Sequence, residues 1–272
     1  MKLIPGGTIS GTNPLSVEGG ESHSDFYPAT YNITVDSFRM DKHLVTKGLW
    51  NEVRNDPETE DRGYTDLPAG GGQGIDHPVY TVSWFDAVKW LNAHSERAGL
   101  DPVYYTDAAF TQVYRTDEVM DPYVKVTANG FRLPTMDQWE YAARGGLQSK
   151  RFPWGDRIDH EKANYWADNS RCEYDDGPGG GEYHPKGLET GSEPYTTPVD
   201  CFPANGYGLH DMAGNLWEWN YDWHPSNVGS YRVLRGGSWR YYAHRCRVGR
   251  RYNPYPANVH PPIGFRAVLS AQ

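Results

Sequence analysis

The chain has 272 residues, with 26 Lys and Arg against 35 Asp and Glu, which gives a formal net charge of −9 at pH 7. An acidic chain has little general attraction for nucleic acid, so we expect no nucleic-acid partner. No apolar run reaches the roughly 20 residues that a membrane-spanning helix needs, and the opening MKLIPGG has no apolar signal-peptide core. After Asp222 the chain has eight Arg and no acidic residue, so we expect a cationic C-terminal region on an acidic body.

The composition is typical of a folded, loop-rich domain. Ten Trp, 20 Tyr and eight Phe argue against disorder, and 30 Gly and 20 Pro favour short regular elements. The three cysteines, Cys172, Cys201 and Cys246, are too few for a disulfide framework and fit no zinc spacing. The sequence leaves open one disulfide or three separate thiols.

The predicted elements begin with an alternating strand over residues 31–38. Helices are predicted to start after Thr46, after Ser83 and at the Thr-Met-Asp-Gln capping box of Thr135. No helix is predicted beyond Lys150, and the acidic, Gly-rich residues 171–198 indicate an insertion or a metal-binding loop. Short strands follow at 231–235 and 265–269. Without a repeat or a linker, residues 1–272 are predicted to form one α+β domain with little regular structure.

Several sequence segments, taken together, resemble the formylglycine-generating-enzyme (sulfatase-modifying factor) family. They are GFRLPTMDQWEYAARGG (130–146), FPWGD (152–156), GYGLHDMAGNLWEWNYDW (206–223), RVLRGGSW (232–239) and IGFRAV (263–268), with IPGG and VDSFRMDKHLVTKGLW near the start. The resemblance covers nearly the whole chain and implies a single irregular domain related to the C-type lectin fold. Large rings are expected to fill its core where regular structure is scarce; they are Trp139, Trp154, Trp217, Trp219 and Trp239.

The segment DMAGNLWE (211–218) suggests a metal site. Two carboxylates bracket backbone that can offer carbonyl groups, and oxygen ligands on a loop suit calcium. The family resemblance implies a structural calcium bound by the side chains of Asp211 and Glu218 and by the carbonyls of Gly214 and Leu216. The alternative is a turn with ordinary hydrogen-bonded carboxylates.

The cysteine pattern bears on catalysis. Family members that oxidise a substrate cysteine to formylglycine bind copper(I) with two cysteines, and the resemblance places these at positions 241 and 246. This chain has Tyr241 and Cys246, and one thiolate cannot form the two-sulfur site. We therefore expect no copper and interpret Cys246 as a buried thiol. Oxidation of a cysteine in a sulfatase-like substrate is the alternative function. The three-histidine motif of the iron-dependent branch is absent from the sequence.

Residues 240–262 (RYYAHRCRVGRRYNPYPANVHPP) contain no Lys, Glu, Gln, Met or Trp. Free exchange of the adenines in the Asn codon AAC produces Tyr, His, Arg, Ala, Gly, Val and Pro, but never those five residues. The pattern resembles a variable protein of a diversity-generating retroelement, of the kind that carries a C-terminal variable region on this fold. Ordinary drift in a loop is the alternative.

The resemblance implies a non-enzymatic, receptor-type protein whose hypervariable site binds a protein or glycan on another cell or surface. It also implies export or cell-surface display, with tethering through a lipid anchor removed from this chain. Tyr and Arg anchor interfaces, so we expect these side chains on one exposed surface, with Cys246 and Val248 pointing inward. The candidate ligand-binding residues are Arg240, Tyr241, Tyr242, Ala243, His244, Arg245, Gly249, Arg250, Tyr252, Tyr255, Ala257, Asn258 and His260.

Overall fold

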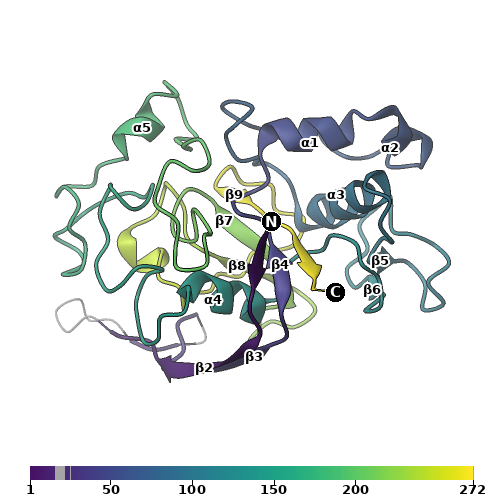
Figure 1. The fold of residues 1–272 in the computed structure, drawn as a ribbon. Coiled ribbons are helices and arrows are strands. Elements are labelled where there is room, and N and C mark those ends of the chain that lie inside the picture. Colours follow the sequence, from purple (N-terminus) through teal and green to yellow (C-terminus); the bar gives the residue numbers. More distant parts are fainter. Residues whose placement is uncertain (16–21, 25, 272) are drawn as a thin grey trace.

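The computed structural model of the protein describes residues 1–15, 22–24 and 26–271, and within them the strands form four small sheets (Figure 1). In the first sheet, the central strand pairs antiparallel with a strand from each end of the chain; it comprises β1 (Lys2–Ile4), β4 (Phe38–Met40) and β10 (Val268–Ser270). Two further antiparallel pairs are β2 (Gly7–Thr12) with β3 (Thr30–Val35), and β5 (Tyr104–Tyr105) with β6 (Tyr123–Val124). The fold is therefore the predicted irregular α+β type.

The fourth sheet supports the C-terminal part of the chain. Its central strand β7 (Trp217–Trp223) pairs antiparallel with β8 (Arg232–Arg235) and parallel with β9 (Ile263–Gly264). Strand β7 was not predicted, although aromatic and polar residues alternate along WEWNYDW; in the structure both faces of this strand are buried or half-buried. Figure 1 shows α4 beside β7 and β8, with α1 and α3 packed together elsewhere.

The three predicted helix starts are confirmed. The helices α1 (Lys47–Arg54), α3 (Trp84–Arg97) and α4 (Met136–Arg144) each follow a Ser or Thr whose hydroxyl accepts a hydrogen bond of 3.1 Å from a backbone N–H three residues on. Gly145 ends α4 with a φ of 56°. The shorter α2 (Pro57–Asp61) and α5 (Pro185–Leu188) were not predicted, because four or five residues are too few for a periodic pattern.

Two strand predictions were wrong in extent. The expected strand 31–38 is split, because the chain leaves one sheet after Val35 and enters another at Phe38. Only the last two residues of the expected strand 265–269 belong to a strand, β10. Residues 265–267 connect β9 to β10, and the carbonyls of Phe265 and Ala267 accept hydrogen bonds of 2.9 Å from the backbone N–H groups of residues 45 and 41. Local alternation cannot reveal such a change of partner.

Tryptophan rings dominate the core, as predicted. Trp50 and Trp90 stack at 5.6 Å between α1 and α3, and Phe265 meets both edge-on. Of the five predicted core rings, four are fully buried and Trp154 is half-buried against Phe152. Within the described residues, no helix is long and apolar enough to cross a membrane.

Candidate functional site

A pocket of about 240 Å³ opens beside β7, β8 and β9, and we call it the C-terminal pocket. Five of the candidate ligand-binding residues line it together; they are Arg240, Tyr241, Tyr252, Asn258 and His260. Its apolar side is supplied by Trp217, Leu234 and Ile263, with Pro262. None of its described lining residues is acidic, so the pocket is both aromatic and cationic.

Two tyrosine rings shape the C-terminal pocket by packing on Trp217. Tyr252 stacks on the indole at 5.7 Å, and Tyr241 meets it edge-on at 6.1 Å. The guanidinium of Arg245 lies 6.0 Å from the centre of the Tyr241 ring. Both tyrosines remain half-buried. Arg240 is half-exposed, and its guanidinium lies 3.9 Å from the carboxylate of Glu193, an exposed pair of little energetic weight.

The backbone of residues 240–262, the C-terminal segment, is held by backbone groups of the scaffold. Tyr252 and Leu234 exchange two hydrogen bonds of 2.9 and 3.1 Å. Scaffold N–H groups of Trp166, Trp84 and Trp217 donate to carbonyls at positions 241, 256 and 262 over 2.8–3.1 Å. These contacts do not involve the side chains of the segment, although one pocket-lining side chain, that of Asn258, accepts a hydrogen bond of 3.0 Å from the backbone N–H of His260.

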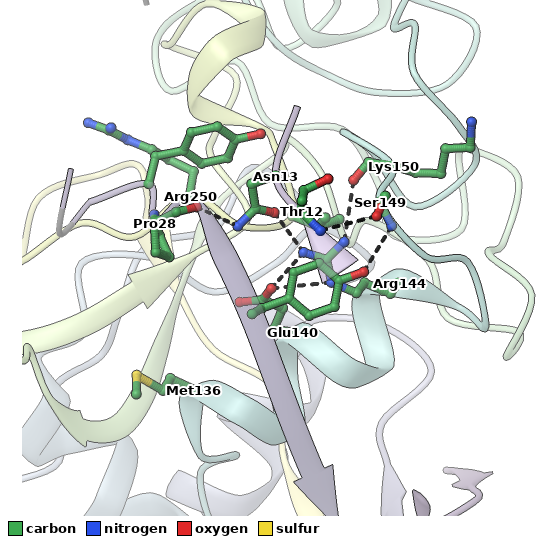
Figure 2. A network of polar contacts seen from close by, with 12 residues as sticks. Thr12, Asn13, Pro28, Met136, Glu140, Arg144, Ser149, Lys150 and Arg250 are labelled. Atoms are coloured by element: carbon green, nitrogen blue, oxygen red, sulfur yellow. Dashed lines mark hydrogen bonds and ion pairs between the residues drawn. The ribbon is translucent and has the colours of Figure 1, made fainter. Parts of the chain in front are cut away.

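A buried charge network fixes a second part of the segment (Figure 2). Glu140 on α4 accepts hydrogen bonds from Arg144 at 2.7 Å and from Arg235 on β8 at 2.8 Å, and all three side chains are buried. Burial raises the pKa of Glu140, but the two guanidiniums outweigh burial and the net pKa is lowered. Arg235 also donates to the carbonyls of Val248 and Arg250 at 3.1 and 3.3 Å, which connects α4 to the C-terminal segment.

The prediction of one exposed surface is only partly correct. Cys246 and Val248 point inward as predicted, but Ala243 is also buried, against Cys246. Gly249 is buried as well, and a Cβ there would lie 2.5 Å from the side-chain oxygen of Asn13. Arg250 does not line the pocket, and its guanidinium lies 5.4 Å from the centre of the Phe26 ring.

The remaining candidates lie around the pocket. Tyr242 stacks on Trp166 at 5.2 Å and is 6.2 Å from the His244 ring. Tyr255 is exposed, and Ala257 packs partly against the core beside the pocket. Three half-buried rings that were not predicted continue this aromatic surface: the ring of Trp166 lies 5.2 Å from that of Tyr183, which lies 4.7 Å from that of Tyr195. Their only sequence signal is the presence of aromatic residues within a Gly-rich stretch.

The C-terminal region is less cationic at its surface than its eight arginines suggest. Arg232, Arg235, Arg247 and Arg266 are all buried. Arg235 is paired with Glu140 and Arg266 with Glu218, while Arg232 lies between the rings of Trp84 and Trp223 at 3.8 and 3.5 Å. Half of the positive charge therefore stabilises the scaffold.

The expected metal ligands lie on a tightly turned segment. Asp211, Gly214 and Asn215 have φ values of 55°, 84° and 62°. Asp211 is buried, and neither carboxylate oxygen has a side-chain or backbone donor within hydrogen-bond geometry among the described residues. Burial raises its pKa to about 7, with the charge of Arg266 opposing the rise and that of Glu218 adding to it. An orphaned, buried carboxylate suits a cation. Glu218 fits less well, because Arg266 and Trp139 donate to its carboxylate at 2.7 Å.

No group of three or more His, Cys, Asp or Glu side chains able to hold a metal is found in the described part of the chain, which includes residues 171–198. The calcium set implied by the resemblance has only two carboxylates, so this finding does not test it. The interpretation of residues 171–198 as a metal-binding loop stays without support.

The structure agrees with the interpretation of Cys246 as a buried thiol. Its side chain is fully buried, and burial raises the pKa of the thiol. A raised pKa disfavours the thiolate that binds metal or attacks a substrate. Cys172, Cys201 and Cys246 are all free thiols, so the disulfide left open by the sequence does not form here.

Comparison with known proteins agrees with this geometry. The sulfatase-modifying factor enzyme 1-like domain matches residues 1–271. The formylglycine-generating enzyme of Streptomyces coelicolor is 36% identical over 93% of this chain and 86% of its own, and chaperone protein LppX of Paenibacillus barcinonensis is 32% identical over 97% and 92%. Among solved structures, Treponema denticola variable protein 1 covers 100% of this chain and 95% of its own, with a TM-score of 0.70 and 25% identity. The chain therefore belongs to the sulfatase-modifying factor enzyme 1-like family, and its fold is similar to that of Treponema denticola variable protein 1.

Proposed function

We propose that this protein is a non-enzymatic binding protein whose C-terminal pocket is a diversified ligand site. The observation that carries the proposal is that the main chain and the side chains of residues 240–262 have different roles. Backbone groups of the scaffold hold the main chain, whereas five side chains that the codon argument permits to vary converge on one pocket. Such an arrangement allows the binding chemistry to change while the fold stays the same. Similarity to a variable protein supports the proposal.

The pocket chemistry indicates the kind of ligand. Tyr241 and Tyr252 offer ring faces supported by Trp217, which suits a sugar ring or an aromatic side chain. Arg240 and His260 add donors without a lining carboxylate to oppose them. The ligand is therefore a protein or glycan surface that presents a ring next to an acidic group. Diversification by a retroelement, export and display toward another cell belong to the same proposal.

The diversified-site proposal predicts that pocket positions tolerate substitution. Replacing Arg240 or His260 by residues other than Pro that are reachable from the codon AAC is expected to change the free energy of unfolding by within about 0.5 kcal/mol, because both side chains are exposed. Gly249→Asn is the matched control inside the same segment, and it should cost about 1–3 kcal/mol or more because the new side chain meets Asn13. Urea denaturation of each variant measures both values.

A library that varies the five pocket residues should yield mostly folded members, which protease resistance on a display platform can score. A library that unfolds as readily as Gly249→Asn would overturn the proposal. The encoding DNA provides a second test. A nearby near-repeat with adenines at these codons, next to a reverse transcriptase gene, is expected, and ordinary drift in a loop would leave neither.

The second candidate function is cysteine oxidation, which similarity to formylglycine-generating enzymes favours. We expect no aldehyde on cysteine-containing peptides supplied with copper, because Tyr241 replaces one thiolate and Cys246 is buried with a raised pKa. The measurement is aldehyde capture by a hydrazide probe, with Cys246→Ala as the control. Turnover clearly above that control would establish the oxidase instead.

The proposal also includes a structural calcium at Asp211. The side chain of Asp211 would hold the ion together with the carbonyls of Gly214 and Leu216, and Glu218 would contribute while remaining bonded to Arg266. The ion supplies the positive charge that the orphaned carboxylate lacks.

A further inference from the structure

A second pocket, of about 360 Å³, lies where the β5–β6 pair meets β7 and the C-terminal strand β10. Figure 1 shows the C-terminal end of the chain beside β6. The wall of this second pocket is mainly apolar and is formed by Val103, Tyr104, Val124, Ala128, Leu133 and Tyr221. Tyr104 and Tyr221 stack at 5.8 Å within this wall. The pocket shares no lining residue with the C-terminal pocket, so it is a separate feature of the molecule.

The charged side chains in this lining are Lys125 and Arg132, both half-buried. Neither forms an ion pair with another described residue. By contrast, Lys42, Lys89, Arg115 and Lys150 each pair with a carboxylate. Arg132 donates to the neutral side chain of Gln138 at 2.8 Å, and Lys125 lies 5.9 Å from the centre of the Tyr105 ring. Two cations at the edge of an apolar pocket, without a paired carboxylate, leave a place for an anionic group.

Asp222 is the acidic residue that influences Arg132 electrostatically, and it does not fill that place. Its carboxylate accepts a hydrogen bond of 2.6 Å from the backbone N–H of Met136 at the start of α4. Asp222 lines the adjoining hollow together with Asp36 and Asp137, and none of the three lines the apolar pocket. Arg132 lines both hollows, and Gln138, which accepts its hydrogen bond, lines the acidic one. Lys125 and Arg132 are therefore the charged residues of the apolar lining, and the described residues of that lining include no carboxylate.

We propose that this pocket binds a small amphipathic carboxylate, such as a medium-chain fatty acid. The apolar body would lie among Val124, Leu133 and Tyr221, and the carboxylate would lie between Lys125 and Arg132. The volume falls within the range of about 300–1,000 Å³ of small-molecule sites, which are mostly apolar with a few polar groups that orient the ligand. Charge-assisted hydrogen bonds from two cations favour a carboxylate over a neutral head group.

Titration calorimetry with decanoate, below the concentration at which it forms micelles, tests the proposal on the whole chain. We expect one saturable site, with decanol at least 10-fold weaker and decyltrimethylammonium not bound. Lys125→Glu should weaken decanoate binding at least 10-fold, whereas Lys186→Glu, a charge reversal on the exposed α5, should leave it unchanged. Ala128→Leu narrows the pocket and should abolish binding.

Thermal denaturation shows that each variant is folded before its affinity is measured. Equal affinity for decanoate and decanol, or a Lys125→Glu affinity equal to that of Lys186→Glu, would overturn the proposal, as would the lack of a saturable site. Tyr252→Ala in the C-terminal pocket should not change the affinity for decanoate. The outcome here is therefore independent of the proposed function.

Discussion

Glu140→Ala is expected to lower the free energy of unfolding by about 3–5 kcal/mol, because it leaves two buried guanidiniums without their counter-charge. Arg144 and Arg235 donate to Glu140 at 2.7 and 2.8 Å, and all three side chains are at most 1% exposed. For a chain of this size, such a loss lowers the melting temperature by roughly 6–20 °C. Urea denaturation and a thermal scan measure the two quantities.

The matched control is Asp176→Ala, which removes a carboxylate from the exposed pair with Arg157. Exposed pairs contribute about 0–1 kcal/mol, so the control should be mild. Since Arg235 also holds the carbonyls of Val248 and Arg250, Glu140→Ala should speed amide hydrogen exchange at residues 246–252. A Glu140 variant as stable as the Asp176 variant would show that water, and not Glu140, satisfies the guanidiniums.

Asp211→Asn is expected to have opposite effects with and without calcium. Without the ion, burial raises the pKa of Asp211 from 3.8 to about 7, so the folded state binds a proton that the unfolded state releases. The stability of the wild type therefore falls as the pH rises from about 4 to 7, and the cost is complete above pH 7. That difference in pKa corresponds to roughly 4 kcal/mol. Asn carries no charge, so the variant should be the more stable protein at pH 8 in chelator.

With calcium the order should reverse, since an ion that binds only the folded wild type adds to its stability. Melting temperatures between pH 4 and 9, in chelator and in calcium, measure both effects. Burial also raises the pKa of Asp41, to about 6, so Asp41 makes both proteins less stable as the pH rises. The difference in melting temperature between the two proteins therefore reports on Asp211 alone. Parallel pH profiles of the two proteins would refute the raised pKa of Asp211. A wild-type melting temperature that does not change when calcium is added would refute the calcium site.

The local parts of the fold could be predicted because they depend on neighbouring residues. Thr46, Ser83 and Thr135 each cap a helix through a hydroxyl three residues from its partner. The sheets could not be predicted, because strands of two to seven residues pair with partners that are distant in sequence, such as β9 with β7. Tryptophan content indicated the core, but not which ring would pack on which.

The candidate site, like the fold, could be predicted only in part. Its segment could be delimited from composition and from the motifs that flank it, and five of its side chains line one pocket. Gly249 and Arg250 were misplaced because the chain there packs against Asn13 and Phe26, which no local pattern reveals. The buried arginines were missed for a related reason, because their partners Glu140 and Glu218 lie in other segments.

The scaffold hydrogen bonds to the C-terminal segment have a consequence for affinity. A binding loop that is ordered only in its complex loses conformational entropy on association, which weakens binding. Here Leu234, Trp84 and Trp217 order the main chain before any ligand arrives. New side chains at the pocket should therefore be held on a preorganised main chain. Matured antibodies have similarly rigid binding loops, and their complexes dissociate slowly. Each diversified sequence would start with the rigidity that an antibody acquires only through selection.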